Sequence, residues 1–531
     1  YSSQNEQDNR HYARFAKVPV LEPSDSQEAY DFARLAFTIS ERFDTPVMLR
    51  PTTRVSHSMS VVEYDEVVVP ARLTPSFTRQ PDKFVMIPAN ARRRHPLVEQ
   101  RIAELAEFAE SFPFNRIEMQ DRSLGVIANG VAYQYARDAM PSASFLKLGM
   151  GYPLPEKMIR RFAEQVERLI IVEELDPFIE ESVKSLGIPV EGKRYFPAVG
   201  ELSLERVTEG FKGLSAIGHQ SSVLSPESRV LGAGVSTQHS GLSTSASPDV
   251  PLPLRPPVLC PGCPHTGAFY ALKRLGFYRP TGETSDGPQG QILAKLKRAG
   301  VVVSGDIGCY TLAVLPPLLA MDTCGCMGAS IGGAMGMQKA GLANRVVAVI
   351  GDSTFLHSGI TPLLDVVYNG GTITTIILDN STTAMTGHQE HPGTGRSAQG
   401  EPARKVDLER LVRGLGIDDV KVVNAFDLAG VSAAIRDSVE RDEPSVVIVR
   451  GACALKVKAA GKPFVVDPEL CDGCGACLRT GCPAIALRNR RAEIEDGTCV
   501  GVACGVCAQA CPKGAILAPG DGGLGTGVGN G

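Results

Sequence analysis

The fold of this chain follows from residues 344–387, which read NRVVAVIGDSTFLHSGITPLLDVVYNGGTITTIILDNSTTAMTG. Val346–Ile350 is an apolar, mostly β-branched run that Gly351 and Asp352 close, and Thr372–Leu378 is a second such run, ending at Asp379 and Asn380. Between them Ile360–Tyr368 has helical spacing of its apolar residues. This order predicts strand, helix, strand, the right-handed crossover of a parallel α/β sheet.

The two strand ends of such a crossover meet at the carboxyl edge of the sheet, where α/β proteins bind ligands. We therefore expect Asp352 to converge with Asn380. A carboxylate, a carboxamide and a backbone carbonyl such as that of Thr382 suit Mg²⁺, which keeps water and substrate phosphates in its other positions. The alternative is a plain βαβ unit with a solvated Asp at a strand end.

The spacing of this Gly-Asp pair and the later Asn resembles the diphosphate motif of thiamine-diphosphate (ThDP) enzymes. The resemblance favours the metal site over the solvated Asp. It implies ThDP and Mg²⁺ as cofactors, held by one group of residues: Gly351, Asp352, Ser353, Asn380, Thr382, Met385, Thr386 and Gly387.

Composition describes an ordinary multidomain globular protein. The 531 residues allow three or four domains, and 43% are hydrophobic. A net charge of −4 gives no basic surface for nucleic acid, and no apolar run is long enough to span a bilayer. Fourteen cysteines suit a reducing compartment and metal clusters, so we expect a soluble, cytoplasmic protein. The chain starts at Tyr1 without a signal peptide, which indicates a truncated or processed start.

We expect an α/β protein made of doubly wound parallel sheets and one small α+β domain. An amphipathic helix at Ser26–Phe43 and a buried strand at Thr45–Leu49 place the first domain at 1–90. A helix at Leu97–Phe112 and strands at 114–120, 145–151 and 168–175 place a second α/β domain, of transketolase C-terminal type, at 91–214. A Ser-, Gly- and Pro-rich linker follows at 215–257 and the ThDP diphosphate domain at 258–455, while the Gly-rich tail at 519–531 is expected to be disordered.

A glycine- and alanine-rich helix at Met327–Gly341 fits close approach to a cofactor or a partner subunit, or simply tight packing. Arg50, Arg54 and His57 follow a strand end, where an Arg can hold a carboxylate in a bidentate manner; the alternative is a solvated loop.

The cysteine-rich segment at 463–518 has the spacing of a two-cluster bacterial ferredoxin. In that pattern the Cys before Pro ligates the other cluster. We therefore assign Cys471, Cys474, Cys477 and Cys511 to one [4Fe–4S] cluster, and Cys482, Cys499, Cys504 and Cys507 to the other. Two spacings of four residues depart from the common pattern, and a zinc site is the alternative. A plant-type [2Fe–2S] cluster needs a distant fourth Cys, which does not follow.

With both signatures in one chain, the whole sequence resembles the large (α) subunits of the indolepyruvate:ferredoxin oxidoreductase family. The segments that carry the resemblance are SSQNEQDNRHYARFAK, TTRVSHS, CPGCPH, GDIGCYTL, the residues from GDSTF to MTGHQ, and the cysteine-rich end. The resemblance implies oxidative decarboxylation of an aryl-pyruvate with coenzyme A to an aryl-acetyl-CoA and CO₂. Electrons would pass to ferredoxin, and a small β subunit would complete an (αβ)₂ assembly.

In that family a Glu that activates the cofactor lies upstream of the SSQNEQDNR element, so we expect the chain to lack it; Glu6 does not match its position. Five residues are candidates for handling substrate or charge: Arg50, Arg54, His57, His265 and His388. A single His is more often a structural hydrogen-bonding group. Two other functions stay open, a non-oxidative ThDP decarboxylase and an electron-transfer subunit with a vestigial ThDP fold.

Six cysteines lie outside the ferredoxin-like segment. In the related pyruvate:ferredoxin oxidoreductases the ThDP domain holds a further [4Fe–4S] cluster, and its ligand positions match Cys260, Cys263, Cys309 and Cys453. The resemblance therefore implies a possible third cluster, with buried, inert thiols as the alternative. Cys324 and Cys326 do not match and are predicted to be packing residues.

Overall fold

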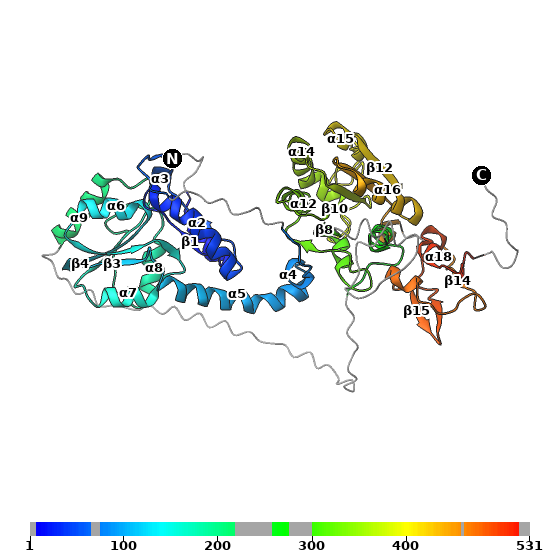
Figure 1. Cartoon of the computed structure of the whole chain (residues 1–531), viewed down its shortest axis with the longest axis horizontal. Helices are drawn as coiled ribbons and strands as arrows, with labels where there is room; N and C mark the ends of the chain where they lie inside the picture. Colours follow the sequence, from blue (N-terminus) through cyan, green and yellow to red (C-terminus); the bar gives the residue numbers. More distant parts are fainter. Residues whose placement is uncertain (1–6, 65–74, 218–256, 275–299, 458–460, 520–531) are drawn as a thin grey trace. The chain divides into compact units, whose positions relative to one another are not determined.

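The computed structural model describes residues 7–64, 75–217, 257–274, 300–457 and 461–519. All but the first residue of the predicted tail, and all but the ends of the predicted linker, lie outside the described residues. The chain divides into two compact units, which are Tyr1–Val68 with Arg92–Ser245 and Val69–Ala91 with Ala246–Gly531 (Figure 1).

The second unit is built on a six-stranded sheet in the order β12-β13-β11-β10-β8-β9, in which every neighbouring pair is parallel. The strands are β8 (Val301–Gly305), β9 (Thr323–Cys324), β10 (Arg345–Gly351), β11 (Thr374–Asp379), β12 (Asp419–Asn424) and β13 (Ser445–Arg450). The pairing of β10 with β11 and the helix α14 (Ile360–Tyr368) between them confirm the predicted strand, helix, strand crossover.

Helices cover both faces of this sheet. Val347 and Val349 of β10 face a core that includes α10 (His265–Leu272) and α16 (Leu428–Glu440). The alternate residues Ala348 and Ile350 face α12 (Ser330–Lys339), α14 and α15 (Leu408–Gly414). A parallel sheet covered on both sides needs strands that are apolar throughout, which explains the continuous Val- and Ile-rich runs. The doubly wound α/β class is therefore confirmed.

The crossover helix begins earlier than its apolar spacing indicates. The short helix α13 (Asp352–Thr354) and the π-helical turn η3 (Phe355–Gly359) connect β10 to α14. Asp352 is thus the first helical residue after the strand. A π-helical turn at such a position often marks a functional site.

The first unit contains two smaller sheets, with the orders β3-β5-β4-β7 and β2-β1-β6. Its strands are β1 (Val20–Leu21), β2 (Met48–Leu49), β3 (Arg116–Glu118), β4 (Asp121–Asn129), β5 (Ala143–Leu148), β6 (Met150–Tyr152) and β7 (Leu169–Val172). Its helices are α1 (Arg10–Ala16), α2 (Ser26–Phe43), α3 (Thr53–His57), α6 (Gly130–Ala139), α7 (Glu156–Ala163), α8 (Phe178–Ser185) and α9 (Leu204–Ile217). The helix α5 (Pro88–Ala109) crosses the unit boundary. The predicted buried strand at Thr45–Leu49 is reduced to β2, which is half-buried.

The segment Val69–Ala91 groups with the second unit, although the sequence places it in the first domain. Its short helix α4 (Pro81–Phe84) precedes Val85, which is fully buried and forms a parallel bridge to Cys324. Arg79 Nε lies 2.6 Å from Oδ1 of the buried Asp322. These contacts, which apolar periodicity does not reveal, fix the segment to the edge of the six-stranded sheet.

The cysteine-rich segment folds as the predicted small α+β module of the second unit. Its strands are β14 (Val465–Val466), β15 (Ile485–Arg488), β16 (Arg491–Ile494) and β17 (Ile516–Leu517), and β14 pairs with β17 as β15 pairs with β16. The short helices are η4 (Cys477–Thr480), η5 (Gly501–Ala503) and α18 (Val506–Ala510), and α17 (Ala454–Val457) precedes the module. Within the described ranges of both units, we find no helix that is long and apolar enough to cross a membrane.

Candidate functional site

Asp352 and the segment after β11 meet at the carboxyl edge of the six-stranded sheet. Gly351 at the end of β10 lies opposite Leu378 of β11. The Asp352 Oδ2 atom accepts a hydrogen bond of 2.8 Å from the backbone N–H of Ser381, next to Asn380. Asp352, Asn380 and Thr382 are all buried. The structure therefore brings together the three residues that the sequence selects as oxygen donors.

The environment of the Asp352 carboxyl suits a bound cation. Burial raises the pKa of Asp352, the nearby Asp379 adds to this shift, and His391 opposes it. A buried carboxylate in this position would be stabilised by a positive ion. Carboxylate, carboxamide and carbonyl oxygens are the ligands that Mg²⁺ accepts, so the donor set fits that ion.

The remaining predicted cofactor contacts fall into two groups. Ser353 is buried beside Asp352, and its Oγ atom lies 2.7 Å from the Thr383 hydroxyl. Met385, Thr386 and Gly387 instead form the exposed end of a turn, which the backbone bonds between Thr383 and Gln389 close. The buried group lies at the sheet edge, and the exposed group lies in the loop that follows it.

His391 belongs to this site, although its sequence context does not single it out. Its side chain is 1% exposed, and its Nε2 atom approaches Asp352 Oδ2 to 3.2 Å without a hydrogen bond of normal geometry. The Nδ1 atom accepts a hydrogen bond of 3.1 Å from the backbone N–H of Gly393. Because Nδ1 is an acceptor, the neutral ring carries its proton on Nε2, the nitrogen nearer the carboxylate. The close approach of His391 to Asp352 therefore places the loop that carries it against the sheet edge.

Four cysteines come together next to this edge. Cys260 and Cys263 precede α10, Cys309 begins the helical turn η2 (Cys309–Val314) after β8, and Cys453 follows β13. Burial raises the pKa values of the Cys260, Cys263 and Cys309 thiols. Repulsion between the thiolates raises these pKa values further, and it acts between every pair of the four cysteines, so all four lie close together. The backbone N–H of Cys453 donates to the carbonyl of Asn380 at 3.2 Å. The cysteine group thus touches the candidate diphosphate edge.

The two cysteines that do not match this group differ from each other. Cys324 in β9 is buried, in agreement with its predicted packing role, and burial raises its pKa to about 11. Cys326 is exposed, so the prediction that it packs in the core is wrong. It lies in the exposed turn between β9 and α12, where its side chain does not pack against apolar residues.

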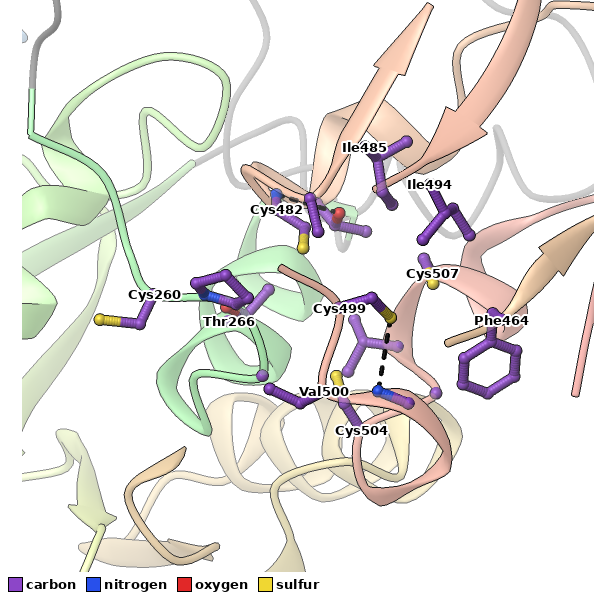
Figure 2. A pocket seen from close by; sticks show the side chains of 17 residues that line it. Cys260, Thr266, Phe464, Cys482, Ile485, Ile494, Cys499, Val500, Cys504 and Cys507 are labelled. Carbon is purple, nitrogen blue, oxygen red and sulfur yellow. Dashed lines mark hydrogen bonds between the residues drawn. The ribbon is translucent and has the colours of Figure 1, made fainter. Parts of the chain in front are cut away.

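The eight cysteines of the small module surround two cavities, divided as predicted. One cavity is lined by Cys471, Cys474, Cys477 and Cys511. The other is lined by Cys482, Cys499, Cys504 and Cys507, and Figure 2 shows these thiols around it. Burial and mutual repulsion raise the pKa of Cys504 to about 11 and that of Cys507 to about 12.

Backbone N–H groups point at several of these sulfur atoms. Ala492 donates to Cys471 at 3.5 Å, Gly501 to Cys499 at 3.4 Å and Ala515 to Cys511 at 3.4 Å. Such donors favour thiolates and help to set the potential of an iron–sulfur cluster. Both cavities therefore fit [4Fe–4S] clusters.

The loop of the Cys260–Cys263 pair lies directly against the second cavity. Cys260, Pro261 and Gly262 line this cavity, whereas Figure 2 shows the Cys260 sulfur pointing away from it. Burial raises the pKa of the Cys482 thiol, and the nearby backbone N–H of Gly262 partly opposes this rise. A Cβ atom on Gly262 would lie 2.4 Å from Val500 Cγ2, so only a glycine permits this approach. The Cys260–Cys263 loop therefore lies between the two groups of thiols.

The five candidates for substrate and charge handling are distributed over both units. In the first unit Arg50 Nη1 contacts Glu22 Oε1 at 2.6 Å, Arg54 Nη2 contacts Glu201 Oε2 at 2.7 Å, and His57 is exposed. In the second unit His388 Nε2 lies 3.9 Å from Cys453 Sγ. His265 is buried, which lowers its pKa to about 4, and no described residue bonds to its Nδ1 atom. The roles of these five residues remain predictions.

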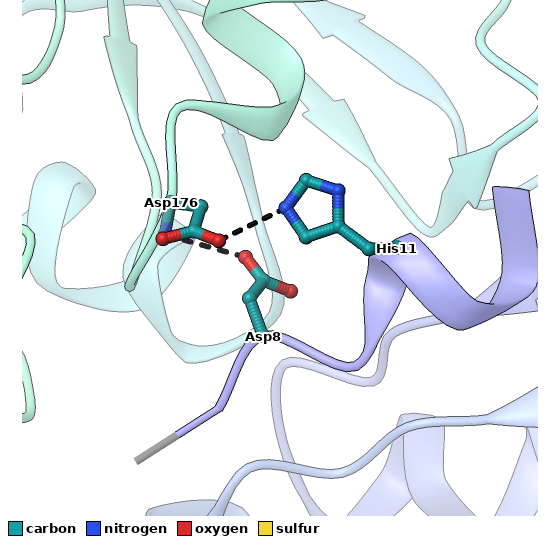
Figure 3. A group of neighbouring side chains, drawn as sticks. All are labelled: Asp8, His11 and Asp176. Carbon is teal, nitrogen blue, oxygen red and sulfur yellow. Dashed lines mark hydrogen bonds and ion pairs between the residues drawn. The ribbon is translucent and has the colours of Figure 1, made fainter.

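Asp8, His11 and Asp176 form a further cluster of side chains that could ligate a metal (Figure 3). Both oxygens of Asp8 are already bonded to the buried Arg10 guanidinium, which also contacts Glu173 Oε2 at 2.6 Å. His11 Nε2 is paired with Asp176 Oδ2 at 2.9 Å. The cluster is therefore an ion-pair network that fastens α1 to the residues after β7.

Three family models match the chain. They are described as the C-terminal TPP binding domain of thiamine pyrophosphate enzymes, over residues 306–449, the ThDP-binding domain of pyruvate flavodoxin/ferredoxin oxidoreductases, over residues 1–105, and a 4Fe-4S dicluster domain, over residues 463–512.

The curated relatives agree with these family models. The chain is 38% identical over 530 residues to the indolepyruvate oxidoreductase subunit IorA of Archaeoglobus fulgidus, covering 97% of this chain and 79% of the relative. It is 36% identical over 551 residues to IorA of Thermococcus kodakarensis, covering 96% and 79%. Among solved structures, a 2-oxoglutarate:ferredoxin oxidoreductase from Magnetococcus marinus has 17% identity and a TM-score of 0.31 over 38% of this chain and 66% of that chain.

Proposed function

The chain belongs to the family of indolepyruvate oxidoreductase subunit IorA, and on this premise we propose that it oxidises aryl-pyruvates with coenzyme A. One aryl-pyruvate, one coenzyme A and two oxidised ferredoxins give one aryl-acetyl-CoA, one CO₂, one proton and two reduced ferredoxins. Indolepyruvate and phenylpyruvate represent the proposed substrate class. We further propose a small β subunit as partner in an (αβ)₂ assembly.

One observation carries the proposal: the cofactor edge, the four-cysteine group and the small module form an unbroken series of contacts. Cys453 is bonded to Asn380 at the edge, at 3.2 Å. The loop that holds Cys260 and Cys263 lines the cavity of Cys482, and the backbone N–H of Gly262 lies near the Cys482 thiol. A non-oxidative decarboxylase has no need for such a series, because it returns the electrons to the product as a C–H bond.

At the diphosphate edge the proposed Mg²⁺ ligands are Asp352, Asn380 and the carbonyl of Thr382. His391 would hold the carboxylate in place, and the buried environment would exclude water from the charged groups. When bound, thiamine diphosphate supplies a thiazolium ring that accepts the electron pair released on decarboxylation. The residues of the chain contribute binding and orientation.

The proposed electron path uses three groups of cysteines in order of contact. Cys260, Cys263, Cys309 and Cys453 would hold the first [4Fe–4S] cluster, next to the edge. Cys482, Cys499, Cys504 and Cys507 would hold the second, and Cys471, Cys474, Cys477 and Cys511 the third. Cys474 is exposed, so the last cluster is the one that can meet an external acceptor.

The test is an anaerobic assay of the chain produced together with its small partner subunit. Reduction of methyl viologen is measured with indolepyruvate, phenylpyruvate and hydroxyphenylpyruvate, and with pyruvate and 2-oxoglutarate as comparison substrates. We expect viologen reduction with the aryl-pyruvates to require coenzyme A, and the Asp352→Ala variant to be inactive. CO₂ release without dye reduction would instead indicate a non-oxidative decarboxylase, and absence of bound ThDP would indicate an electron-transfer subunit.

A further inference from the structure

The hairpin β15–β16 carries three arginines at its turn. Arg488 ends β15, Arg491 begins β16, and Asn489 and Arg490 form the two-residue connection. Asn489 has φ of 48° and Arg490 has φ of 61°. Two successive residues of positive φ define a tight hairpin turn that normally contains Asn followed by Gly. Here Arg490 stands where glycine would be the relaxed choice.

The flanking arginines also oppose the stability of the hairpin. Arg488 and Arg491 are directly opposite each other in the ladder, and like charges in such a pair repel. Glu493 offers only a partial compensation, because its Oε2 atom lies 3.6 Å from Arg488 Nε and both side chains are more than half exposed. Residue types that destabilise the turn or strand in which they stand are expected where those residues serve a function.

The turn lies beside the cavity of Cys471, Cys474, Cys477 and Cys511. A Cβ atom on Gly473, between the first two of these cysteines, would lie 2.0 Å from the Arg490 carbonyl oxygen. Ala492, the residue after Arg491, donates its backbone N–H to Cys471 Sγ and lines the same cavity. Asp472, the acidic residue in this lining, is 3.6 Å from Lys513 Nζ and is thereby compensated.

We propose that Arg488, Arg490 and Arg491 form the docking surface for a small acidic iron–sulfur protein that accepts electrons from the adjacent cluster. This proposal rests on the proposed function and adds the position and the charge of the acceptor site. At each encounter the cluster loses one electron and the acceptor gains it, so two encounters follow each 2-oxoacid. Opposite charges at the contact raise the encounter rate and orient the acceptor with its cluster towards Cys474, which is exposed.

The test uses the full chain, loaded with its cofactors and bound to its small partner subunit. The variant Arg488→Ser/Arg490→Gly/Arg491→Ser removes the charge, and Arg410→Ser removes an exposed arginine of α15 as the matched control. An acidic two-cluster ferredoxin and the cationic dye methyl viologen are compared as acceptors. We expect the KM for ferredoxin to rise at least about tenfold at low salt in the triple variant, with the viologen rate unchanged. The salt dependence of ferredoxin reduction should also weaken.

Binding of the oxidised ferredoxin, measured by calorimetry without turnover, separates this proposal from the proposed function. Weaker binding to the triple variant than to Arg410→Ser supports the docking surface even if no 2-oxoacid is oxidised. If the triple variant loses iron, the single variant Arg490→Gly decides, because it relaxes the turn and should raise thermal stability while weakening ferredoxin binding. Unchanged ferredoxin binding would overturn the proposal, as would a raised KM for coenzyme A with an unchanged KM for ferredoxin.

Discussion

At the scale of single residues, we propose that cofactor binding depends on Asp352. Its carboxyl group is buried at the strand end and is the only full negative charge among the proposed metal ligands. Asp352→Ala should weaken Mg²⁺–ThDP binding more than about 100-fold, beyond the loss typical of residues outside the ligand set. Bound ThDP in anaerobically purified protein measures this. Asp365→Ala, in the exposed part of the same crossover, is the control. Tight ThDP binding by the first variant would refute the assignment.

A substitution in the small module should have the opposite effect, removing iron and leaving ThDP in place. Cys471→Ala should leave ThDP bound, because the module and the diphosphate edge use different residues. The cavity of Cys471, Cys474, Cys477 and Cys511 would lose one thiol. We expect loss of one cluster or its conversion to a three-iron species, with slower reduction of ferredoxin. Iron analysis and low-temperature electron paramagnetic resonance check this result, and unchanged iron content would show that Cys471 is not a ligand.

His391 makes a separate prediction, because it contacts Asp352 but is not a proposed ligand. His391→Ala should weaken Mg²⁺–ThDP binding about 10–100-fold, which is typical for a partner that orients a ligand. His391→Gln keeps a donor and should restore part of the affinity. His357→Ala, in the exposed turn before α14, should have no effect. ThDP titrations followed by calorimetry distinguish these cases; equal affinities throughout would contradict the positioning role.

At the scale of elements, capped and periodic segments could be predicted from the sequence. The helix α2 has the predicted limits, since an amphipathic run follows the N-cap Asp25, whose side chain accepts from the Glu28 backbone. The sequence does not predict the strand β4, because its first three residues are polar and exposed. The helix α5 starts at Pro88 rather than Leu97, in a polar stretch without apolar periodicity.

The residues of the candidate site also divide into those that the sequence predicts and those that it does not. Asp352 and Asn380 could be placed because parallel strand ends meet at one edge. His391 could not, since its contact with Asp352 depends on the path of a long loop between β11 and α15. Such a path leaves no periodic signal in the sequence. The contact of Gly262 with Cys482 likewise depends on how the small module packs against the sheet domain.

That packing gives an element-scale prediction for Gly262→Ala. The new methyl group would lie 2.4 Å from Val500 Cγ2, and φ of 69° disfavours alanine. Gly370→Ala is the matched control, since Gly370 has φ of 59° and open space around its Cβ position. We expect Gly262→Ala to be less stable than the control by about 1–3 kcal/mol in denaturant unfolding, the usual cost of overpacking.

The double variant Gly262→Ala/Val500→Ala tests the cause of this loss. Removing the Val500 methyl groups should recover most of the difference from the control, because residues in contact do not have additive effects. Failure of the second substitution to recover stability would mean that Val500 does not limit the approach of the loop.

Across the whole molecule, the number of clusters decides whether the electron path is continuous. As thiolates, Cys260, Cys263, Cys309 and Cys453 would repel one another, and Cys263 and Cys453 are buried, so the charged form needs a cation such as the iron of a cluster. Anaerobic protein should therefore contain about twelve irons per chain, three [4Fe–4S] clusters, and Cys263→Ser should retain about eight.

This loss should affect electron transfer more than cofactor binding. In Cys263→Ser the contacts of Asp352 are unchanged, so ThDP stays bound, while reduction of both viologen and ferredoxin falls because the first acceptor is missing. In Cys326→Ser, an exposed cysteine of the same domain, iron and activity should match the unmodified chain. About eight irons in the unmodified chain, with the same number in Cys263→Ser, would reject the cluster at Cys260, Cys263, Cys309 and Cys453. Electrons would then have to pass from the diphosphate edge to Cys482 through the Pro261–Gly262 loop alone.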